Sequence, residues 1–321
     1  MPNLSTTTWV DEKTTSLQEV ERLLTSPHDD ERSSTSLSYI NWNVEKSLEH
    51  DCTLKFNGKE TTFNCFRYSF EQFSVGMEDD KVKKEGYIIP YLCNDKIRYI
   101  VTRNTGAMTM LRKLLAYSGK NEIKKSPLNL TDDLFVWLIS KVYKGENIFV
   151  SESEDLQNLT IDSIRGIKGD TEDLLTKVSA VGESVINIIS TLSFLLESQN
   201  LNQIKLAINY GKHENIDMAL SIKNVVSCDF IRYQGEYLSF ENEDERIATL
   251  FVMLYMEILP IIIQTYVSEI ENNQWGGGKS VDFLKQVAED LSGKVKKRVE
   301  DLTNESNQFY HSLKGDSMET E

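Results

Sequence analysis

Two stretches of alternating apolar and polar residues, each centred on a tight-turn pair, constrain the fold of this 321-residue chain more than any other feature. The segment CTLKFNGKETTFNCFRY (52–68) alternates on both sides of Asn57-Gly58, and GYIIPYLCNDKIRYIVTRN (86–104) repeats the arrangement around Asn94-Asp95. Alternation is the period of a half-buried strand, and these turn residues tolerate the left-handed backbone of a short hairpin loop. Both stretches therefore predict antiparallel β-hairpins.

Helical patterns follow the second hairpin. Residues 106–119 carry apolar side chains at helical spacing, and Gly119 is the expected stop. Residues 130–145 begin with Thr131, a good N-cap, continue with two aspartates that suit the positive end of the helix dipole, and end at Gly145. Each of these segments predicts one helix.

A second group of strands and helices is predicted from residue 159 onward. Residues 159–181 favour two strands that turn at 169–173, because an alternating run with branched side chains ends at Val181. A helix is expected from Glu183 over SVINIISTLSFLLES, followed by strand-like segments at 202–212, 215–228 and 229–240. A long helix from Asp244 to about residue 270 completes the group, with acidic residues crowded at its start.

The predicted fold class is α+β, with two units of antiparallel strands and packed helices plus a C-terminal amphipathic helix. Residues 1–35 are rich in Ser, Thr, Asp and Glu and predict a disordered tail, in which LQEVERLL (17–24) leaves room for one short helix. The N-terminal α+β domain is expected at residues 36–158 and the C-terminal α+β domain at 159–275. Residues 276–321 are predicted to form a glycine hinge, an amphipathic helix and a tail.

The longest apolar run, IATLFVMLYMEILPIII (247–263), lies inside the predicted long helix. It is slightly short for a membrane span and contains Glu257 and Pro260, so it predicts a helix buried in protein and no membrane span. The chain starts without a charged-then-apolar leader, and its four cysteines are scattered. These two features favour a cytoplasmic protein with reduced thiols.

The segment NNQWGGGKS (272–280) ends like a phosphate-binding P-loop. A working P-loop has the form Gly-x-x-x-x-Gly-Lys-Ser/Thr and joins a strand to a helix, so that backbone amides surround the phosphates. Asn273 stands at the first glycine position here, and the preceding segment is a predicted helix. The triplet of glycines therefore predicts a hinge between two helices, and no nucleotide cofactor is expected.

Signals for catalysis and metal binding are weak. The four histidines lie in no catalytic motif, and the spacing of His50, Cys52 and Cys65 matches no familiar zinc pattern. A nuclease of the restriction type needs an aspartate and a Glu-x-Lys strand to hold Mg²⁺. The nearest candidate places Gln203 where the glutamate belongs, with Asp170 upstream. The sequence predicts no catalytic residue, no metal and no cofactor.

One segment of the chain is basic, although the chain as a whole is acidic. The formal net charge is −15, which argues against indiscriminate adhesion to DNA, yet residues 96–125 hold eight basic residues and only one acidic residue, Glu122. Such a concentration can neutralise phosphates and give salt-dependent binding, or it can form a solvated face paired with the acidic remainder. The candidate nucleic-acid-binding residues in this segment, which begins at Lys96, are Arg98, Arg103, Arg112, Lys113, Lys120, Lys124 and Lys125.

The order of segments over roughly residues 85–270 also points to a family. The hairpin IIPYLCNDKIRYIVTRN and two helices precede IRGIKGDTEDLLTKVSAVGES, an apolar helix, the strands IKLAINYGKHENIDMALSI and the long helix EDERIATLFVMLYMEIL. This arrangement resembles the phage-exclusion protein RexA and the B subunit of the Kiwa defence system. The resemblance implies a nucleic-acid-binding, non-enzymatic part of bacterial phage defence. It carries no site residue over to this chain.

We therefore expect a non-catalytic bacterial anti-phage defence protein that binds nucleic acid, such as DNA, or a phage-derived partner through a basic edge. The final amphipathic helix is expected to pair with a second copy, giving a homo-oligomer, or with a partner of the defence system. Two alternatives stay open. One is a metal-dependent nuclease of a defence system, and the other is a protein-interaction module such as a phage-encoded inhibitor of host defence.

Overall fold

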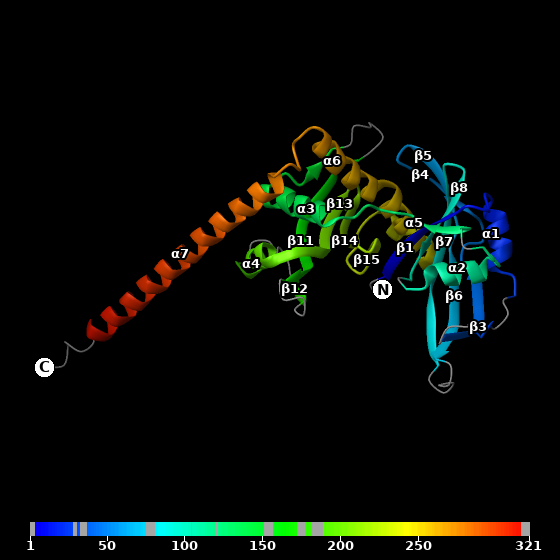
Figure 1. Cartoon of the computed structure of the whole chain (residues 1–321), viewed down its shortest axis with the longest axis horizontal. Coiled ribbons are helices and arrows are strands. Elements are labelled where there is room, and N and C mark those ends of the chain that lie inside the picture. The colour runs from blue at the N-terminus through cyan, green and yellow to red at the C-terminus, as the bar shows by residue number, and fades with distance from the viewer. Residues whose placement is uncertain are drawn as a thin grey trace.

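The structure is a computed structural model that describes residues 4–27, 31–32, 37–74, 81–103, 105–119, 121–150, 157–171, 177–181 and 189–315. Figure 1 shows an elongated body of strands flanked by helices, from which one long C-terminal helix points away. The described helices and helical turns are α1 (Leu17–Leu24), α2 (Ala107–Leu114), α3 (Asp132–Lys144), α4 (Ile189–Glu197), η2 (Glu236–Ser239), α5 (Glu243–Met253), η3 (Leu254–Ile258), α6 (Leu259–Glu271) and α7 (Lys279–Gly315).

Antiparallel strand pairs connect the whole body. The main path runs β10-β11-β13-β14-β15-β1-β8-β7-β6-β3-β2, with β12, β9 and the β4–β5 hairpin paired alongside it. The fold class is therefore α+β, as predicted. The strands are β1 (Leu4–Asp11), β2 (Glu31–Arg32), β3 (Leu37–Lys46), β4 (Cys52–Phe56), β5 (Lys59–Phe63), β6 (Phe66–Ser74), β7 (Val82–Cys93), β8 (Lys96–Val101), β9 (Ile123–Lys125), β10 (Ile148–Phe149), β11 (Leu159–Thr171), β12 (Lys177–Val181), β13 (Ser198–Tyr210), β14 (His213–Ser221) and β15 (Val225–Asp229).

The N-terminal strand β1 joins the two parts of this sheet. Thr6 pairs with Val226 of β15, and Thr7 pairs with Val101 of β8. The Thr6 hydroxyl donates to the Val226 carbonyl at 2.8 Å, so a buried threonine side chain is satisfied by the neighbouring strand. The prediction of a disordered tail over residues 1–35 is therefore wrong for β1, whereas α1 lies where the sequence left room for a short helix. Residues 1–3, 28–30 and 33–35 lie outside the described part.

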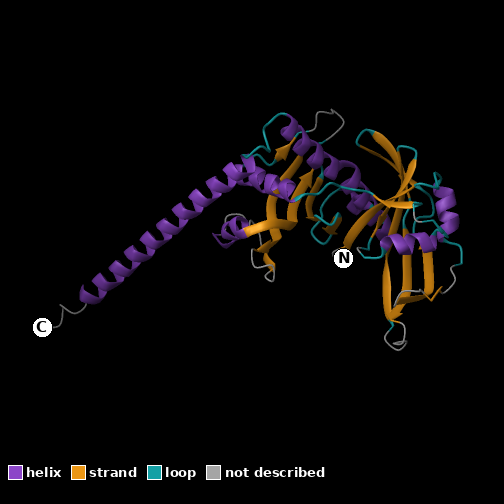
Figure 2. Ribbon diagram, viewed as in Figure 1, coloured by secondary structure: helices purple, strands orange, loops and turns teal. Residues whose placement is uncertain are grey.

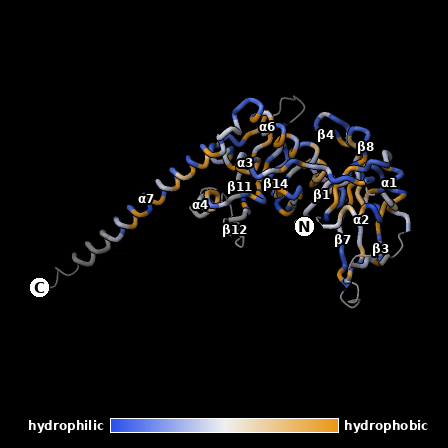
Figure 3. Tube along the Cα trace, in the orientation of Figure 1, coloured by the Kyte–Doolittle hydropathy of each residue, from blue (hydrophilic) through white to orange (hydrophobic). Residues whose placement is uncertain are grey.

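Two hydrophobic cores flank the sheet. The larger core lies between β11, β13 and β14 and the helices α3, α5 and α6, with Trp137, Ile204 and Phe251 fully buried. The smaller core lies between β1, β6, β7 and β8 and the short helices α1 and α2, and it includes Tyr99 and Leu111. Figure 2 shows these helices against the strands of each part, and Figure 3 shows the apolar residues gathered where they meet.

Local turn and capping signals are confirmed at most positions. The β4–β5 turn has φ of 50° at Asn57 and 71° at Gly58, and the β7–β8 turn has two positive φ values as well. Thr131 caps α3 by accepting a hydrogen bond from the Leu134 amide, and Gly145 ends α3 with φ of 73°. The helix expected over 106–119 is shorter, because the left-handed backbone of Ala116 (φ 54°) follows the last helical turn of α2.

The part after residue 159 differs from expectation at one segment. β11 and β12 pair as predicted, but the turn expected at 169–173 is wrong for residues 169–171, which continue β11; residues 172–176 lie outside the described part. The helix α4 is described from Ile189, and residues 182–188 before it are not described. The strand expected at 229–240 is wrong: Asp229 ends β15, after it only Gln234 makes a bridge, to Glu214, and η2 follows. Tyr233 and Tyr237 turn inward there to pack around His213, which a straight strand could not provide.

The long apolar helix is a core element. α5, η3 and α6 continue one another. η3 is a π-helical turn that ends two residues before Pro260, whose ring lacks the amide needed for regular helical bonding. Among the described residues, the helix Glu243–Glu271 is the one that is long and apolar enough to cross a membrane. Its most apolar window is 72% buried in the protein, as expected for a helix of the core.

The glycine triplet joins two helices. α6 ends at Glu271, α7 begins at Lys279, and Gly276, Gly277 and Gly278 all have positive φ. A strand–loop–helix unit is therefore not formed, in agreement with the prediction that this is a connection and not a P-loop. Trp275 anchors the connection, because its indole nitrogen donates to the Asp133 carboxylate at 2.8 Å and its ring is buried.

His213 gives the fold an expected pH dependence. Its side chain is 5% exposed, Nδ1 lies 2.6 Å from the Tyr233 hydroxyl, Nε2 lies 3.8 Å from Glu236 Oε1, and the Tyr237 ring packs beside it. Burial lowers the pKa of His213, Glu236 opposes this shift, and Lys212 adds to it. The unfolded chain therefore takes up the proton first as pH falls, so the stability that His213 contributes above about pH 6.5 is lost on acidification.

We expect the difference in unfolding free energy between the wild-type protein and His213→Gln to shrink as the pH falls from about 7.5 to about 5.5. Urea titrations at the two pH values measure it. The comparison with the variant is needed because burial raises the pKa of Glu257 and Asp132, and raised carboxyl pKa values stabilise the fold on acidification. A pH-independent difference would contradict this assignment.

Candidate nucleic-acid interface

The structure places part of the predicted basic set on one face of the sheet. Arg98 of β8 and Lys124 of β9 both pair with Val10 of β1, so the three side chains project from the same face. Lys124 and Lys96 share the Glu12 carboxylate, at 3.5 and 3.0 Å. These two lysines are therefore occupied by a neighbouring acid, as the alternative interpretation of the basic segment expects.

The other predicted residues lie on the opposite face or apart from both. Arg112 and Lys113 belong to α2, which packs on the face of Tyr99 and not on the face of Arg98. The Arg112 guanidinium donates to the Ser118 carbonyl at 3.0 Å. Lys125 donates to the Lys223 carbonyl at 2.8 Å, beside the β14–β15 turn, and Lys120 lies outside the described residues. The described basic residues therefore do not form a single edge. Arg98 and Lys124 project from one face of the sheet, whereas α2, with Arg112 and Lys113, packs on the other face.

Two aromatic side chains of β3, which the sequence analysis did not single out, complete the α2 face. Ile40 pairs with Glu71 and Asn43 pairs with Ser69, so β3 contains one extra residue between these pairs. Asn41 has φ of 54° at this β-bulge. Residues three apart point to opposite faces of a regular strand, but the bulge brings Tyr39 and Trp42 to the same face.

Both rings contact Phe70 of β6. The Trp42 and Phe70 ring centroids are 4.4 Å apart with the rings stacked, and the Tyr39 and Phe70 centroids are 5.6 Å apart edge to face. Phe70 is buried, whereas Tyr39 and Trp42 are half-buried and present part of each ring to solvent. Phe70 therefore forms the buried part of this aromatic cluster, and Tyr39 and Trp42 form its solvent-accessible part.

Two residues of the predicted basic set lie against these rings. The Arg103 guanidinium carbon lies 4.9 Å from the Phe70 centroid, and Lys113 Nζ lies 5.2 Å from the Tyr39 centroid. Arg103 is oriented by hydrogen bonds to the Thr105 carbonyl and Gln72. Such cation–π contacts are worth roughly 0.5–1 kcal/mol each at exposed sites. We call Tyr39, Trp42, Phe70, Arg103 and Lys113 the aromatic–cationic surface.

Arg103 also acts on a neighbouring tyrosine of this face. Burial raises the pKa of Tyr68, and Arg103 opposes that shift through its positive charge. The Tyr68 and Phe70 rings are stacked with centroids 6.0 Å apart. Arg103 thus lies beside two aromatic residues of β6, Tyr68 and Phe70.

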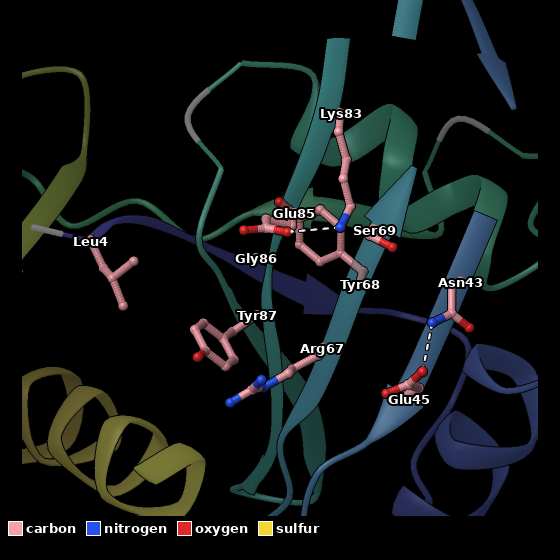
Figure 4. Close-up of a pocket in the computed structure, with 10 residues that line it drawn as sticks. All are labelled: Leu4, Asn43, Glu45, Arg67, Tyr68, Ser69, Lys83, Glu85, Gly86 and Tyr87. Carbon is pink, nitrogen blue, oxygen red and sulfur yellow. Dashed lines mark hydrogen bonds and ion pairs between the residues drawn. The ribbon is translucent and has the colours of Figure 1, made fainter. Parts of the chain in front are cut away.

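A groove of about 560 Å³ lies on the other face of β6 and β7 (Figure 4). Figure 4 shows the Arg67 and Tyr87 side chains next to one another, and the guanidinium carbon is 5.7 Å from the ring centroid. Arg67 is already held by Asp244, with two nitrogen–oxygen distances of 2.6 Å, and this hydrogen bonding raises the pKa of Arg67. Lys83 pairs with Glu85 at 3.3 Å.

The charges of the groove are therefore paired within the protein. The two-point contact between Arg67 and Asp244 ties β6 to α5, which gives it a structural role. Gly86 is required at this wall, because a Cβ atom there would lie 2.3 Å from the Thr102 hydroxyl. The groove therefore presents charges that already pair with acidic residues of the protein, which makes it a poor site for a polyanion.

The residues that the sequence suggested for metal ligation lie on several elements of the fold. Within the described ranges, no group of three or more His, Cys, Asp or Glu side chains is placed to hold a metal ion. All four cysteines are free, and burial raises the pKa of Cys52 to about 11. Gln203 pairs with Lys168 on β11, and the backbone of Asp170 pairs with Asn200.

Comparison with known proteins assigns no family to the chain. No family model matches the chain, and a search of curated proteins found no match.

Proposed function

We propose that this chain is a non-catalytic nucleic-acid-binding protein that takes single strands on the aromatic–cationic surface. The observation that carries the proposal is the bulge at Asn41, which brings Tyr39 and Trp42 to the face where Arg103 lies against Phe70 and Lys113 lies against Tyr39. Proteins that bind single strands combine positive side chains along the phosphate chain with aromatic rings on which bases stack. Both components meet here on one face.

The overall acidity favours this narrow site over broad binding of duplex DNA. A net charge of −15 repels a polyanion at long range, so attraction must come from a local surface. Base stacking supplies energy that does not depend on net charge, at roughly 1–3 kcal/mol per base. Two half-buried rings can therefore contribute more than the few cations beside them.

The resemblance in segment order to RexA and to the B subunit of Kiwa supports the biological setting. On that basis we propose a role in bacterial phage defence, in which binding of nucleic acid reports infection. The setting and the binding activity are separate proposals, because binding rests on residues of this chain and the setting rests on the order of its segments.

Neutralising two matched pairs of cations tests the choice of face. Arg103→Gln with Lys113→Gln removes two charges from the aromatic–cationic surface, and Arg98→Gln with Lys124→Gln removes two from the opposite face. For a single-stranded oligonucleotide we expect the first pair to lower the slope of log K against log salt by about 0.7, since one lost phosphate contact removes about 0.7 and the buried Lys113 Nζ lies against the Tyr39 ring. The second pair is expected to leave the slope unchanged.

Filter retention or fluorescence anisotropy over a salt series measures both slopes, and thermal unfolding of each variant verifies the fold. An equal loss in the two pairs would mean that binding is not localised. A loss confined to Arg98 and Lys124 would move the interface to the opposite face and overturn the proposed site.

A further inference from the structure

The long helix α7 is only partly covered by the rest of the chain. Its first turns pack on the body: Phe283 and Val287 are buried, and the Phe283 ring lies 5.7 Å from that of Tyr143 on α3. α4 also lies against α7. Beyond these contacts α7 extends away from the body, with apolar positions at intervals along it (Figures 1 and 3).

The extended part carries an exposed apolar stripe. Val295, Val299 and Leu302 are 44%, 57% and 47% exposed. Their spacing of four and three residues places them on one side of the helix, as in the seam of a coiled coil. A shallow hollow lined by Val299, Leu302, Thr303 and Ser306 lies along the same side. The stripe thus has projecting apolar side chains and a hollow that can accept the side chains of a second helix.

Two opposite charges border the stripe on one flank. Arg298 and Glu305 are seven residues apart and lie close enough for Arg298 Nη1 to reach Glu305 Oε1 at 3.9 Å. In heptad terms, Val295 and Leu302 occupy d, Val299 occupies a, and both charged residues occupy g. Within one helix the Arg298 Nη1–Glu305 Oε1 distance is 3.9 Å, at the long end for an ion pair, so each side chain is able to pair with a second helix.

We propose that α7 pairs with α7 of a second copy of this chain in antiparallel orientation. In that register Val299 packs against Leu302 of the second copy, and Val295 packs against its Ser306. The two g positions then face one another, so Arg298 meets Glu305 of the second copy, and the twofold axis repeats the contact. A parallel pair would place Arg298 opposite Thr303 and would form no such charge pair.

A pair of matched substitutions tests the surface. Leu302→Glu puts a charge in the stripe, whereas Asn304→Glu puts the same charge on an exposed position of the opposite side of α7. Sedimentation equilibrium of the full chain is expected to show a dimer for the wild type and for Asn304→Glu. Leu302→Glu is expected to raise the dimer dissociation constant at least about tenfold, with unchanged helical circular dichroism. A monomeric wild type, or equal dimers in both variants, would overturn the proposal.

Cysteine cross-linking tests the orientation separately. In the antiparallel register, a mixture of Val295→Cys and Ser306→Cys chains should form a disulfide between the two, while Val295→Cys alone should not. Two copies of residue 295 would then lie about 16 Å apart along the axis, at 1.5 Å per residue. Cross-linking of Val295→Cys with itself would show a parallel pair and would refute the orientation.

Discussion

Replacing Tyr39 and Trp42 together by alanine is expected to weaken binding of a single-stranded oligonucleotide at least about 30-fold. Each ring offers one stacking position, and loss of a stacked base costs roughly 1–3 kcal/mol, so two positions cost roughly 2 kcal/mol or more. Phenylalanine at both positions preserves a ring and is expected to retain most of the affinity. Fluorescence anisotropy with a labelled oligonucleotide measures the change.

A second stacked aromatic pair provides the control for this experiment. Tyr237 and Phe240 are also half-buried, with ring centroids 5.4 Å apart, but they lie on the other part of the sheet beside His213. Their double alanine variant is expected to bind the oligonucleotide as the wild type does. If both double variants lost affinity equally, the loss would reflect general destabilisation, and stacking at Tyr39 and Trp42 would lose its support.

Asp11→Ala is expected to lower the free energy of unfolding by about 3 to 4 kcal/mol. The buried Asp11 carboxylate accepts hydrogen bonds from the hydroxyls of Tyr99 and Tyr117, at 2.6 and 2.9 Å, and from the amides of Lys13 and Thr14. Burial also raises the pKa of Tyr99 and Tyr117, so both hydroxyls remain donors. Alanine leaves these donors buried without their acceptor, which costs roughly 1–3 kcal/mol for each unsatisfied group.

The adjacent residue gives a matched control. Glu12 is also acidic and also pairs with residues of β8 and β9, but its partners Lys96 and Lys124 are more than half exposed. Exposed ion pairs contribute little to stability because solvent screens them, so Glu12→Ala should change stability little. Denaturant titration of both variants makes the comparison. Similar small losses would mean that the N-terminal strand is not an integral part of the sheet.

Local signals in the sequence predicted much of the fold. The turn pairs at Asn57 and Asn94 fixed two hairpins because their left-handed backbone is a property of the residues themselves. The cap at Thr131 and the stop at Gly145 located α3 for the same reason. Acidic residues before Ile247 and the apolar run after it located the long core helix.

Contacts between residues far apart in the sequence determine the features that local sequence patterns did not predict. Thr6 belongs to a buried strand because its hydroxyl bonds to Val226, some 220 residues away, and no local pattern records that acceptor. The aromatic–cationic surface depends on one extra residue in β3, and the asparagine at position 41 is its only local sign. The spacing of Arg98 and Arg112 along the chain likewise says nothing about which face of the sheet each will occupy.

Photocross-linking of the 321-residue chain to an oligodeoxynucleotide containing 5-iododeoxyuridine tests the central claim most directly, because the halogenated base joins to an aromatic ring on which it stacks. Peptide mapping by mass spectrometry is predicted to locate the adduct at Trp42 or Tyr39. An adduct found only near Arg98 and Lys124, or no adduct above that of the Tyr39→Ala/Trp42→Ala variant, would contradict the account.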